Sequence, residues 1–376
     1  MIHTTTLLLI TTLRHNLHAH PELSLAEHET KRTLMNFLRR HTSLEVVDRG
    51  AWFYACYHAP PDGCGRVAFR ADFDALPIQE TNAALAYRSQ CSGVMHGCGH
   101  DGHAAALCGL ALELERTGAR HDVYMIFQHG EEIGAGGADC ASLLREKNID
   151  AVFAMHNLSG YPENAVIVRD GLTQCASRGI TFHFHGTSCH ASQPEDGRNP
   201  SFAVAELVLA SRRLLQTNPW QGLVLATPVH LESGSENFGI AADEGGLSLT
   251  LRADHEEELA QLEALLRTEA ARLSARDGLT WSADIHDPFP ETRNDPTAVA
   301  VVRQAAAALG LPLVSLAAPW RASEDFGWYT KICPGAMFYL GNGDTYPPLH
   351  TADYDFNDHL LATAVDLFLK IEQQLP

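Results

Sequence analysis

The chain has 376 residues, of which 45% are hydrophobic and 19% are charged, a composition typical of a globular protein of more than one domain. Its 46 Asp and Glu residues outnumber its 27 Lys and Arg residues, and the net charge of −19 argues against nucleic acid or an anionic membrane as a partner. No apolar run approaches the roughly 20 residues of a membrane span, and Leu7–Ile10 is too short for a signal peptide. The nine cysteines form no CxxC pair, so we expect a cytoplasmic protein with reduced thiols.

The first 40 residues predict two helices. Helical periodicity extends over residues 7–40 and is interrupted at Pro21. We interpret His15–Ser24, which contains this proline, as a helix–turn–helix segment with a packing role.

Continuous apolar segments predict strands farther along the chain, at residues 52–57, 67–71, 123–128 and 151–155. Helical segments lie between the later ones, so we expect a mainly parallel sheet covered by helices on both faces. Polar side chains follow three of the strands: Asp72 and Asp74, then Glu131 and Glu132, then His156. Sites in such sheets form at the carboxyl ends of the strands, so these side chains are expected to meet.

The stretch Met95–His103 contains three histidines, one cysteine and one aspartate, spaced by glycines. Glycine allows the backbone to turn tightly, and Cys, His and Asp hold borderline divalent metals. Residues 104–112 predict a buried helix. Cys98 and His100 would then project from the loop before this helix, with His103 about one turn later.

The pattern changes near residue 178 and changes back near residue 288. Between these points, alternating segments and amphipathic helices follow the order strand–helix–strand–strand–helix–strand, which predicts a small α+β unit. We therefore expect a catalytic domain of residues 1–177 and 288–376 with residues 178–287 inserted into it.

Each candidate residue also has an ordinary structural explanation. A Glu pair is usually solvated, a single histidine such as His156 or His350 is more often structural, and Cys98 could be a small buried apolar residue. The Glu131–Glu132 pair, however, follows a buried strand and precedes a glycine-rich loop. We therefore favour one carboxylate as a metal ligand and the other as a general base that holds water.

Together, several segments resemble the metal-dependent amidohydrolase branch of the aminoacylase/carboxypeptidase metallopeptidase superfamily, which includes hippurate hydrolases and indole-acetyl-amino-acid hydrolases. The segments are Arg70–Pro77, Met95–His103, Phe127–Glu132 with Gly136–Ala138, His156–Leu158, Ser323–Phe326 and Leu349–His350. The resemblance spans nearly the whole chain.

The resemblance implies two divalent metal ions per chain, Zn²⁺ or Mn²⁺, with Co²⁺ or Ni²⁺ as substitutes in vitro. It makes Glu131 the general base and assigns Asp74 to orienting a ligand. Asp72 stands where sister branches have a metal ligand, but we expect neither aspartate to bind metal here. His96, Asp101 and His103 are assigned supporting roles. The implied metal ligands are Cys98, His100, Glu132, His156 and His350.

The inserted unit resembles the family's lid, and the resemblance implies a homodimer that forms through this unit. Gly186–Ala191 resembles a loop whose histidine reaches the scissile carbonyl oxygen, so His190 is the implied oxyanion donor. Asn237 and Arg252 resemble lid residues that hold the substrate's carbonyl and free carboxylate. The departures from the family pattern lie near the substrate, at His129–Gly130, Glu195, Asn199–Pro200 and Phe238–Ala241.

These observations predict hydrolysis of an N-acyl-amino acid or a related amide that carries a carboxylate. A carboxypeptidase, dipeptidase or aminopeptidase could use the same two-metal site, although Arg252 favours a substrate carboxylate over a free amine. A metal-free hydrolase that uses Cys98 with a histidine is a hypothesis of a different class, and so is a catalytically silent binding protein. The intact Glu131 and ligand set argue against the silent protein.

Overall fold

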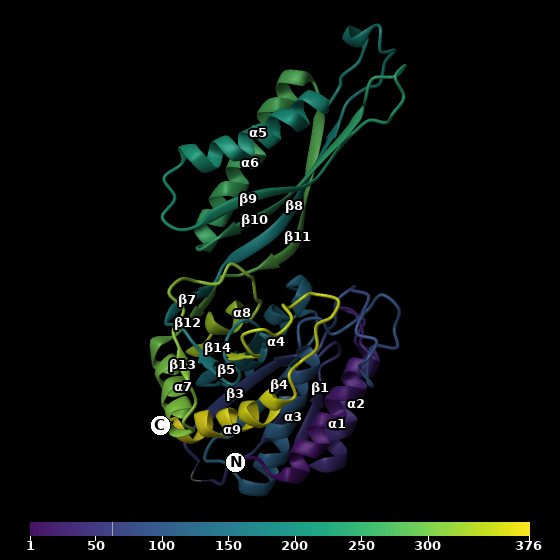
Figure 1. Cartoon of the computed structure of the whole chain (residues 1–376). Helices are drawn as coiled ribbons and strands as arrows, with labels where there is room; N and C mark the ends of the chain where they lie inside the picture. Colours follow the sequence, from purple (N-terminus) through teal and green to yellow (C-terminus); the bar gives the residue numbers. More distant parts are fainter. Residues whose placement is uncertain (62) are drawn as a thin grey trace. The chain divides into compact units, whose positions relative to one another are not determined.

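The computed structural model describes residues 1–61 and 63–376, which form two compact units (Figure 1). Unit 1 comprises Met1–Thr173, Thr292–Trp320 and Glu324–Pro376. Unit 2 comprises Gln174–Glu291 and Arg321–Ser323. The chain thus leaves unit 1 after Thr173, returns to it at Thr292, and contributes the short segment Arg321–Ser323 to unit 2 later on.

Unit 1 contains an eight-stranded sheet in the order β1-β2-β4-β3-β5-β14-β6-β13. Its helices are α1 (Thr4–Ala19), α2 (His28–His41), α3 (His100–Thr117), α4 (Gly137–Glu146), α7 (Pro296–Ala308), α8 (Gly327–Thr330) and α9 (His359–Gln374), with the 3₁₀ turn η1 (Glu131–Ile133). Its strands are β1 (Glu45–Asp48), β2 (Phe53–Tyr57), β3 (Arg66–Asp72), β4 (Asp122–Gln128), β5 (Ala151–Leu158), β6 (Val166–Ile167), β13 (Leu313–Val314) and β14 (Gly335–Gly341). The short strands β7 (Gly171–Gln174) and β12 (Thr292–Asn294) form a separate pair.

The centre of the large sheet is parallel, because β4, β3, β5 and β14 all pair in that sense. Strands β1 and β2 are antiparallel additions at one edge, and β6 pairs antiparallel with β14 near the other. The predicted mainly parallel mixed sheet is confirmed. Its parallel strands bring their carboxyl ends to one edge of the sheet, where the polar side chains gather.

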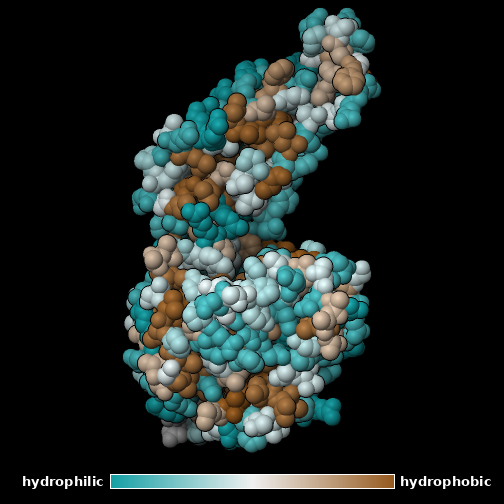
Figure 2. All heavy atoms as spheres, viewed as in Figure 1, coloured by the Kyte–Doolittle hydropathy of each residue, from teal (hydrophilic) through white to brown (hydrophobic). Residues whose placement is uncertain are grey.

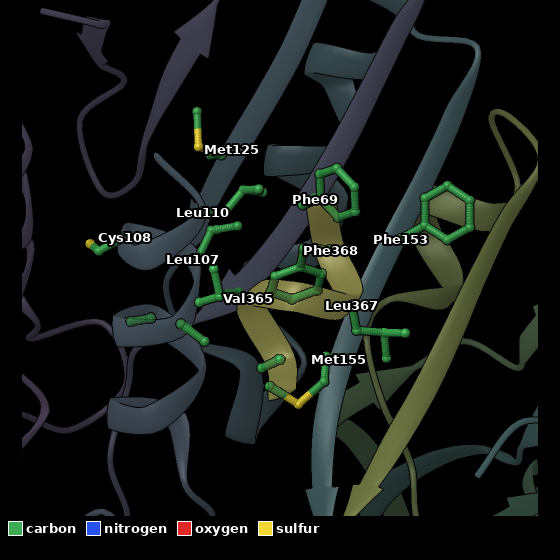
Figure 3. Close-up of a cluster of buried hydrophobic side chains, with 14 of the residues drawn as sticks. Phe69, Leu107, Cys108, Leu110, Met125, Phe153, Met155, Val365, Leu367 and Phe368 are labelled. Carbon is green, nitrogen blue, oxygen red and sulfur yellow. The ribbon is translucent and has the colours of Figure 1, made fainter. Parts of the chain in front are cut away.

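Both faces of this sheet are buried, which explains why its strands are apolar at nearly every position. On one face, Phe69 packs with Phe153 and with Phe368 of α9 (Figure 3). Helices α1, α2, α3 and α7 complete that layer. Their neighbours Ala68 and Val152 point to the opposite face, which α4 and α8 cover. The strands are therefore sandwiched between two layers of helices.

Two elements differ in extent from the sequence prediction. Strand β5 continues to Leu158, because it pairs with β14 through the Gly341–Leu158 register, so His156 lies within the strand rather than after it. Helix α3 begins at His100, because Gly99 adopts a φ of 97° and turns the chain directly into the helix. His100 is thus held by a helix rather than by a loop.

Unit 2 has the predicted order β8 (Ala176–His185), α5 (Ser201–Thr217), β9 (Val224–Ser233), β10 (Glu244–Ala253), α6 (Glu256–Asp277) and β11 (Thr280–Phe289), with the 3₁₀ turn η2 (Pro194–Asp196) after β8. Its strands form an antiparallel sheet in the order β11-β8-β10-β9. Leu207 of α5 and Leu262 and Leu266 of α6 pack on one face of this sheet. The predicted small α+β unit is confirmed. None of the helices within residues 1–61 and 63–376 is long and apolar enough to cross a bilayer.

Candidate metal centre

The polar side chains singled out in unit 1 converge beyond the ends of its central strands. Cys98 lies in the loop before α3 and His100 is the first residue of that helix. Glu131 and Glu132 form the turn η1, three residues after β4 ends. His156 comes from β5 and His350 from the loop before α9, so residues from four separate segments meet.

The donor atoms form two overlapping groups that share one sulfur. Cys98 Sγ lies 3.4 Å from His156 Nε2 and 3.3 Å from His350 Nε2. Glu132 Oε2 lies 3.6 Å from His350 Nε2, and Glu132 Oε1 lies 3.8 Å from His100 Nε2. The groups Cys98–His100–His156 and Cys98–Glu132–His350 each have all their donor atoms within 4.8 Å of one another. One thiolate and one carboxylate could therefore serve two neighbouring ions.

Hydrogen bonds on the far side of each ring orient the histidines toward this centre. His100 Nδ1 lies 3.0 Å from the Asp74 carbonyl oxygen and 3.1 Å from its carboxylate, so it carries the proton and donates it. His156 Nδ1 donates in the same way to the Asn157 carbonyl oxygen at 2.7 Å. Both Nε2 atoms thus face the centre, which is the orientation of metal-binding histidines. The predicted orienting role of Asp74 fits this geometry.

Two buried donor atoms of the centre lack a hydrogen-bond partner, which bears on whether a divalent metal fits there. His100 Nε2 and Glu132 Oε1 are buried and have no hydrogen-bond partner among the described residues. Buried polar atoms are normally satisfied, so two such atoms facing one centre fit a bound cation. Thiolate, imidazole and carboxylate are the donors that Zn²⁺ prefers, and Mn²⁺ accepts the nitrogen and oxygen members of the set. The residues fit a pair of divalent ions.

The electrostatics lead to the same conclusion. Burial, followed by the charges of Glu132 and Glu131, raises the pKa of the Cys98 thiol well above its ordinary value. Burial raises the pKa of Glu132 to about 7 and that of Glu131 well above its ordinary range. Burial lowers the pKa of His100, but Asp72 and Asp74 more than offset it and raise the value to about 10. Cys98, Glu131 and Glu132 therefore cannot all lose their protons easily in the protein alone. Bound cations would favour the deprotonated forms of these groups.

Glu131 points toward a second acidic group. Its carboxylate oxygen lies within 4.8 Å of those of Glu324 and Asp325. Asp325 accepts hydrogen bonds from Arg70 at 2.8 Å and from Gln128, and Arg70 also lies 3.0 Å from Glu324. These residues belong to segments that carry the family resemblance, but the sequence assigned them no role. Asp325 is 255 residues from Arg70 and 197 residues from Gln128 in the sequence, so no local spacing could have indicated the network.

Asp72 and His103 form a supporting chain beside the centre. Asp72 Oδ1 lies 2.6 Å from His103 Nδ1, and Arg70 also donates to the Asp72 carboxylate. His103 Nε2 lies 2.6 Å from Asn157 Oδ1, and Asn157 Nδ2 donates to the Tyr354 hydroxyl oxygen at 2.6 Å. Asp72 is thus occupied by protein partners and only approaches His100 Nε2, at 3.9 Å. The contribution of Asn157 and Tyr354 was not predicted from the sequence.

The remaining histidine and aspartate of the Met95–His103 stretch, His96 and Asp101, belong to none of the donor groups. Asp101 Oδ2 lies 2.8 Å from His18 Nδ1 and 3.4 Å from Arg14 Nε, so it ties α3 to α1. His96 is fully buried, and burial lowers its pKa to about 4, so it is neutral. The Asp101 contacts link the two helices behind the centre, whereas neither ring nitrogen of His96 has a hydrogen-bond partner among the described residues.

The predicted substrate residues His190, Asn237 and Arg252 all lie in unit 2. His190 Nδ1 accepts a hydrogen bond from the main-chain N–H of Ser192 at 3.1 Å, which leaves the ring proton on Nε2 as a donor. A bridge between His190 and Ile240, with a hydrogen bond from the Ala191 N–H to the Gly239 carbonyl oxygen, joins its loop to the β9–β10 hairpin that carries Asn237. His190 and Asn237, both exposed, thus lie on two loops of unit 2 that are joined to each other.

Arg252 lies on β10, near the opposite end of the same sheet. Its Nη1 donates to the Arg321 carbonyl oxygen at 2.9 Å and to Ser323 Oγ at 2.7 Å. Burial lowers its pKa, though the group stays cationic. The guanidinium is therefore held in place within unit 2.

A parallel α/β sheet with Cys, His and Glu donors beside a free carboxylate is the arrangement of a metallohydrolase. Residues 68–374 match peptidase family M20/M25/M40, and the chain belongs to this family. The N-acetyl-L-cysteine deacetylase of Bacillus subtilis (strain 168) is 29% identical over 349 residues, covering 91% of this chain and 83% of that protein. An uncharacterized hydrolase of Staphylococcus haemolyticus (strain JCSC1435) is 31% identical over 367 residues, 94% of each chain.

Solved structures show the same fold. The YxeP protein of Bacillus subtilis, a dinuclear metal-binding peptidase from the M20 family, aligns with a TM-score of 0.80 at 25% identity over 98% of both chains. The aminobenzoyl-glutamate utilization protein of Klebsiella pneumoniae aligns with a TM-score of 0.74 at 19% identity, over 98% of this chain and 95% of that one. The chain is thus a hydrolase of the M20 family, and the family and fold expected from the sequence are confirmed.

Proposed function

We propose that this protein hydrolyses the amide bond of N-acyl-amino acids, or of related amides with a free carboxylate, using two divalent metal ions. The observation that carries the proposal is Cys98, whose sulfur belongs to both donor groups while Glu131 stands beside them. The proposed ligands are Cys98, His100, Glu132, His156 and His350. Zn²⁺ or Mn²⁺ fits the donor set best.

The bound ions would lower the pKa of water and polarise the amide carbonyl. Glu131 would accept the proton from the attacking water and pass it to the leaving nitrogen. Its raised pKa suits that exchange, since a carboxylate with an ordinary pKa would hold the proton poorly at neutral pH. Asp74 would keep His100 in the tautomer whose Nε2 faces the centre.

Unit 2 would supply substrate contacts. His190, whose Nε2 carries the proton, would donate to the carbonyl oxygen as it gains negative charge. Asn237 would hold the same carbonyl, and Arg252 would bind the substrate carboxylate with its forked donors. The deacetylase relative acts on an N-acetyl-amino acid by name, which supports a substrate of this kind. The departures at Glu195 and Phe238–Ala241 leave the acyl group and the amino acid open.

The proposal predicts metal-dependent release of amino acids from an acyl-amino acid panel. N-acetyl, N-benzoyl and indole-acetyl amino acids should be incubated with enzyme that has been reconstituted with Zn²⁺ or Mn²⁺, and the free amine measured. We expect turnover of at least one substrate, loss of at least about 99% of activity on chelation, and recovery when metal is returned. Matching amides without the carboxylate serve as the control and should react more slowly.

Different outcomes of the same assay would identify the competing functions. Cleavage only of peptides with a free amine would indicate an aminopeptidase, and cleavage of unblocked dipeptides a dipeptidase or carboxypeptidase. Full activity after chelation would indicate a thiol hydrolase using Cys98. Bound metal without turnover of any substrate would favour a binding protein. Each of these results would replace the proposal.

We also propose that two copies of the chain associate through unit 2. Strand β9 is an edge of its sheet, and its Val229 and Leu231 are 62% and 54% exposed. Helix α5, which lies beside β9, exposes Phe202 and Leu209 to a similar degree. Figure 2 shows apolar residues among the polar ones on the surface of unit 2. A long apolar edge strand is normally covered, and a second copy would cover it.

The association predicts that Leu231→Glu disrupts a dimer. Sedimentation of the wild type should give twice the monomer mass, whereas the variant should sediment as a monomer at micromolar concentration, because like charges would oppose each other across the pair. Ile285→Glu on β11, the other edge of the sheet, is the matched control and should leave the dimer intact. A monomeric wild type would contradict the proposal.

A further inference from the structure

The turn between α1 and α2, residues Pro21–Glu27, contacts the loop after β3, which contains Asp74, and the loop after β4, which leads into Glu131 and Glu132. We propose that Glu27, assisted by Ser24, positions the Glu131–Glu132 turn for catalysis. The inference rests on the proposed function of that turn. The segment lies before residue 68, where the family match begins. The sequence indicated a packing role for His15–Ser24 and no role for Glu27.

Glu27 holds the residue that precedes the proposed base. Its Oε1 accepts a hydrogen bond from the Gly130 N–H at 2.8 Å, and both groups are buried. Gly130 has a φ of 58°, a left-handed conformation that sends the chain sharply from the end of β4 into Glu131. A buried main-chain N–H without an acceptor is unfavourable, so this bond stabilises the bent path. Removal of the acceptor would free the turn at the point where Glu131 begins.

Ser24 supports the other glutamate through Asp74. Ser24 Oγ donates to Asp74 Oδ2 at 2.7 Å, and the same oxygen accepts the Glu132 N–H at 3.0 Å. The main chain reinforces this contact, because the Ala75 N–H donates to the Glu22 carbonyl oxygen at 2.9 Å. One short segment thus holds both sides of the glutamate turn, directly at Gly130 and indirectly at Glu132.

Backbone strain lies between these two contacts. Leu25 has a φ of 65°, which is unfavourable for a bulky side chain. Its side chain is 57% exposed, so core packing does not explain the conformation. A Cβ placed on Gly130 would lie 3.2 Å from Leu25 Cδ2, which shows that Leu25 covers Gly130 closely. Strain of this kind persists where the surrounding contacts require it, and here those contacts are made by Ser24 and Glu27.

The test compares Glu27→Ala with Glu27→Gln in metal-loaded enzyme. The alanine variant has no acceptor, so kcat should fall on the order of 10- to 100-fold, while KM and metal content stay within about two-fold, because only the base is displaced. Glutamine keeps an oxygen for the Gly130 N–H, so kcat should stay within about three-fold of the wild type. In the metal-free protein, hydrogen exchange at the Gly130 amide should accelerate in Glu27→Ala and not in Glu27→Gln.

The control is a buried carboxylate with the same kind of bond elsewhere. Glu372 Oε1 accepts the main-chain N–H groups of Arg120 and His121 at 2.8 and 3.1 Å, near the start of β4 rather than its end. Glu372→Ala should lower the Tm at least as much as Glu27→Ala, yet leave kcat within about two-fold. A purely structural role for Glu27 would make the two variants alike in kcat.

The proposal is overturned if folded Glu27→Ala keeps kcat within two-fold of the wild type, or if Glu27→Gln loses as much as alanine. If Glu27→Ala does not fold, Glu27→Asp takes its place. Its shorter side chain moves the carboxylate oxygen away from the Gly130 N–H, and the same limits on kcat then apply. A wild type that cleaves no amide would refute the proposed function, while amide exchange at Gly130 would still decide whether Glu27 holds the turn.

Discussion

Glu131→Gln should lower kcat by about 10³-fold without changing the metal content, because the substitution removes the proposed base and keeps the shape of the side chain. Glu131 is 6% exposed and lies 3.9 Å from His100 Nε2, within reach of a water shared with the donor groups. Burial and the neighbouring carboxylates Glu324 and Asp325 favour its protonated form, so it can hold a proton during the reaction. The measurement is steady-state kinetics on enzyme whose metal content has been determined.

The adjacent residue provides the matched control. Glu132 Oε1 and Oε2 face His100 and His350, so Glu132→Gln should weaken metal binding, whereas Glu131→Gln should not. The two substitutions are chemically identical and one residue apart, so they separate proton transfer from metal binding. Activity of metal-loaded Glu131→Gln within ten-fold of the wild type would show that another group takes the proton.

Cys98→Ala should weaken metal binding by more than about 100-fold, since even partners that only orient ligands change affinity by about 10- to 100-fold. Cys98 Sγ is the donor common to both groups, so its loss should affect both ions and reduce the metal content well below two per chain. Activity should fall with the metal content. In saturating Zn²⁺ the Tm should also fall relative to the wild type, because bound metal stabilises the folded state.

Cys108→Ala is the control for this substitution. Cys108 is a buried thiol of α3 that packs in the apolar core rather than at the metal centre (Figure 3). Its removal should cost some stability through the cavity left behind, but metal content and kcat should be unchanged. Normal metal content in Cys98→Ala, measured by elemental analysis, would remove Cys98 from the proposed ligand set.

The sequence predicts the long elements of the fold well, because their burial leaves a clear pattern. Strands β3, β4 and β5 are apolar on both faces, and the helices between them are amphipathic or Ala-rich. The strands β1, β6, β7, β12 and β13 were not predicted, since two to four residues carry no periodicity. The end of β5 was placed too early for a different reason, because His156 and Asn157 are polar residues inside a paired strand.

For the candidate site, the types of residue were predictable and their arrangement was not. Cys98, His100 and the two glutamates indicate metal chemistry because few other roles use such side chains together. The network behind them depends on contacts between distant segments: Arg70 meets Asp325 across 255 residues, and Glu27 meets Gly130 across 103. Such pairs follow from topology, which a single sequence does not display.

By itself, the sequence determined the family and the order of the long elements, and it predicted the chemistry of the candidate centre, because these follow from side-chain chemistry and burial patterns. Only the tertiary structure decided that the Cys98 sulfur is common to both donor groups, and that His100 and His156 present Nε2. The reason is geometric: the direction of each donor is set by the backbone of α3, β5 and η1 and by hydrogen bonds on its far side. Those bonds exist only once the parallel strands have brought their carboxyl ends together.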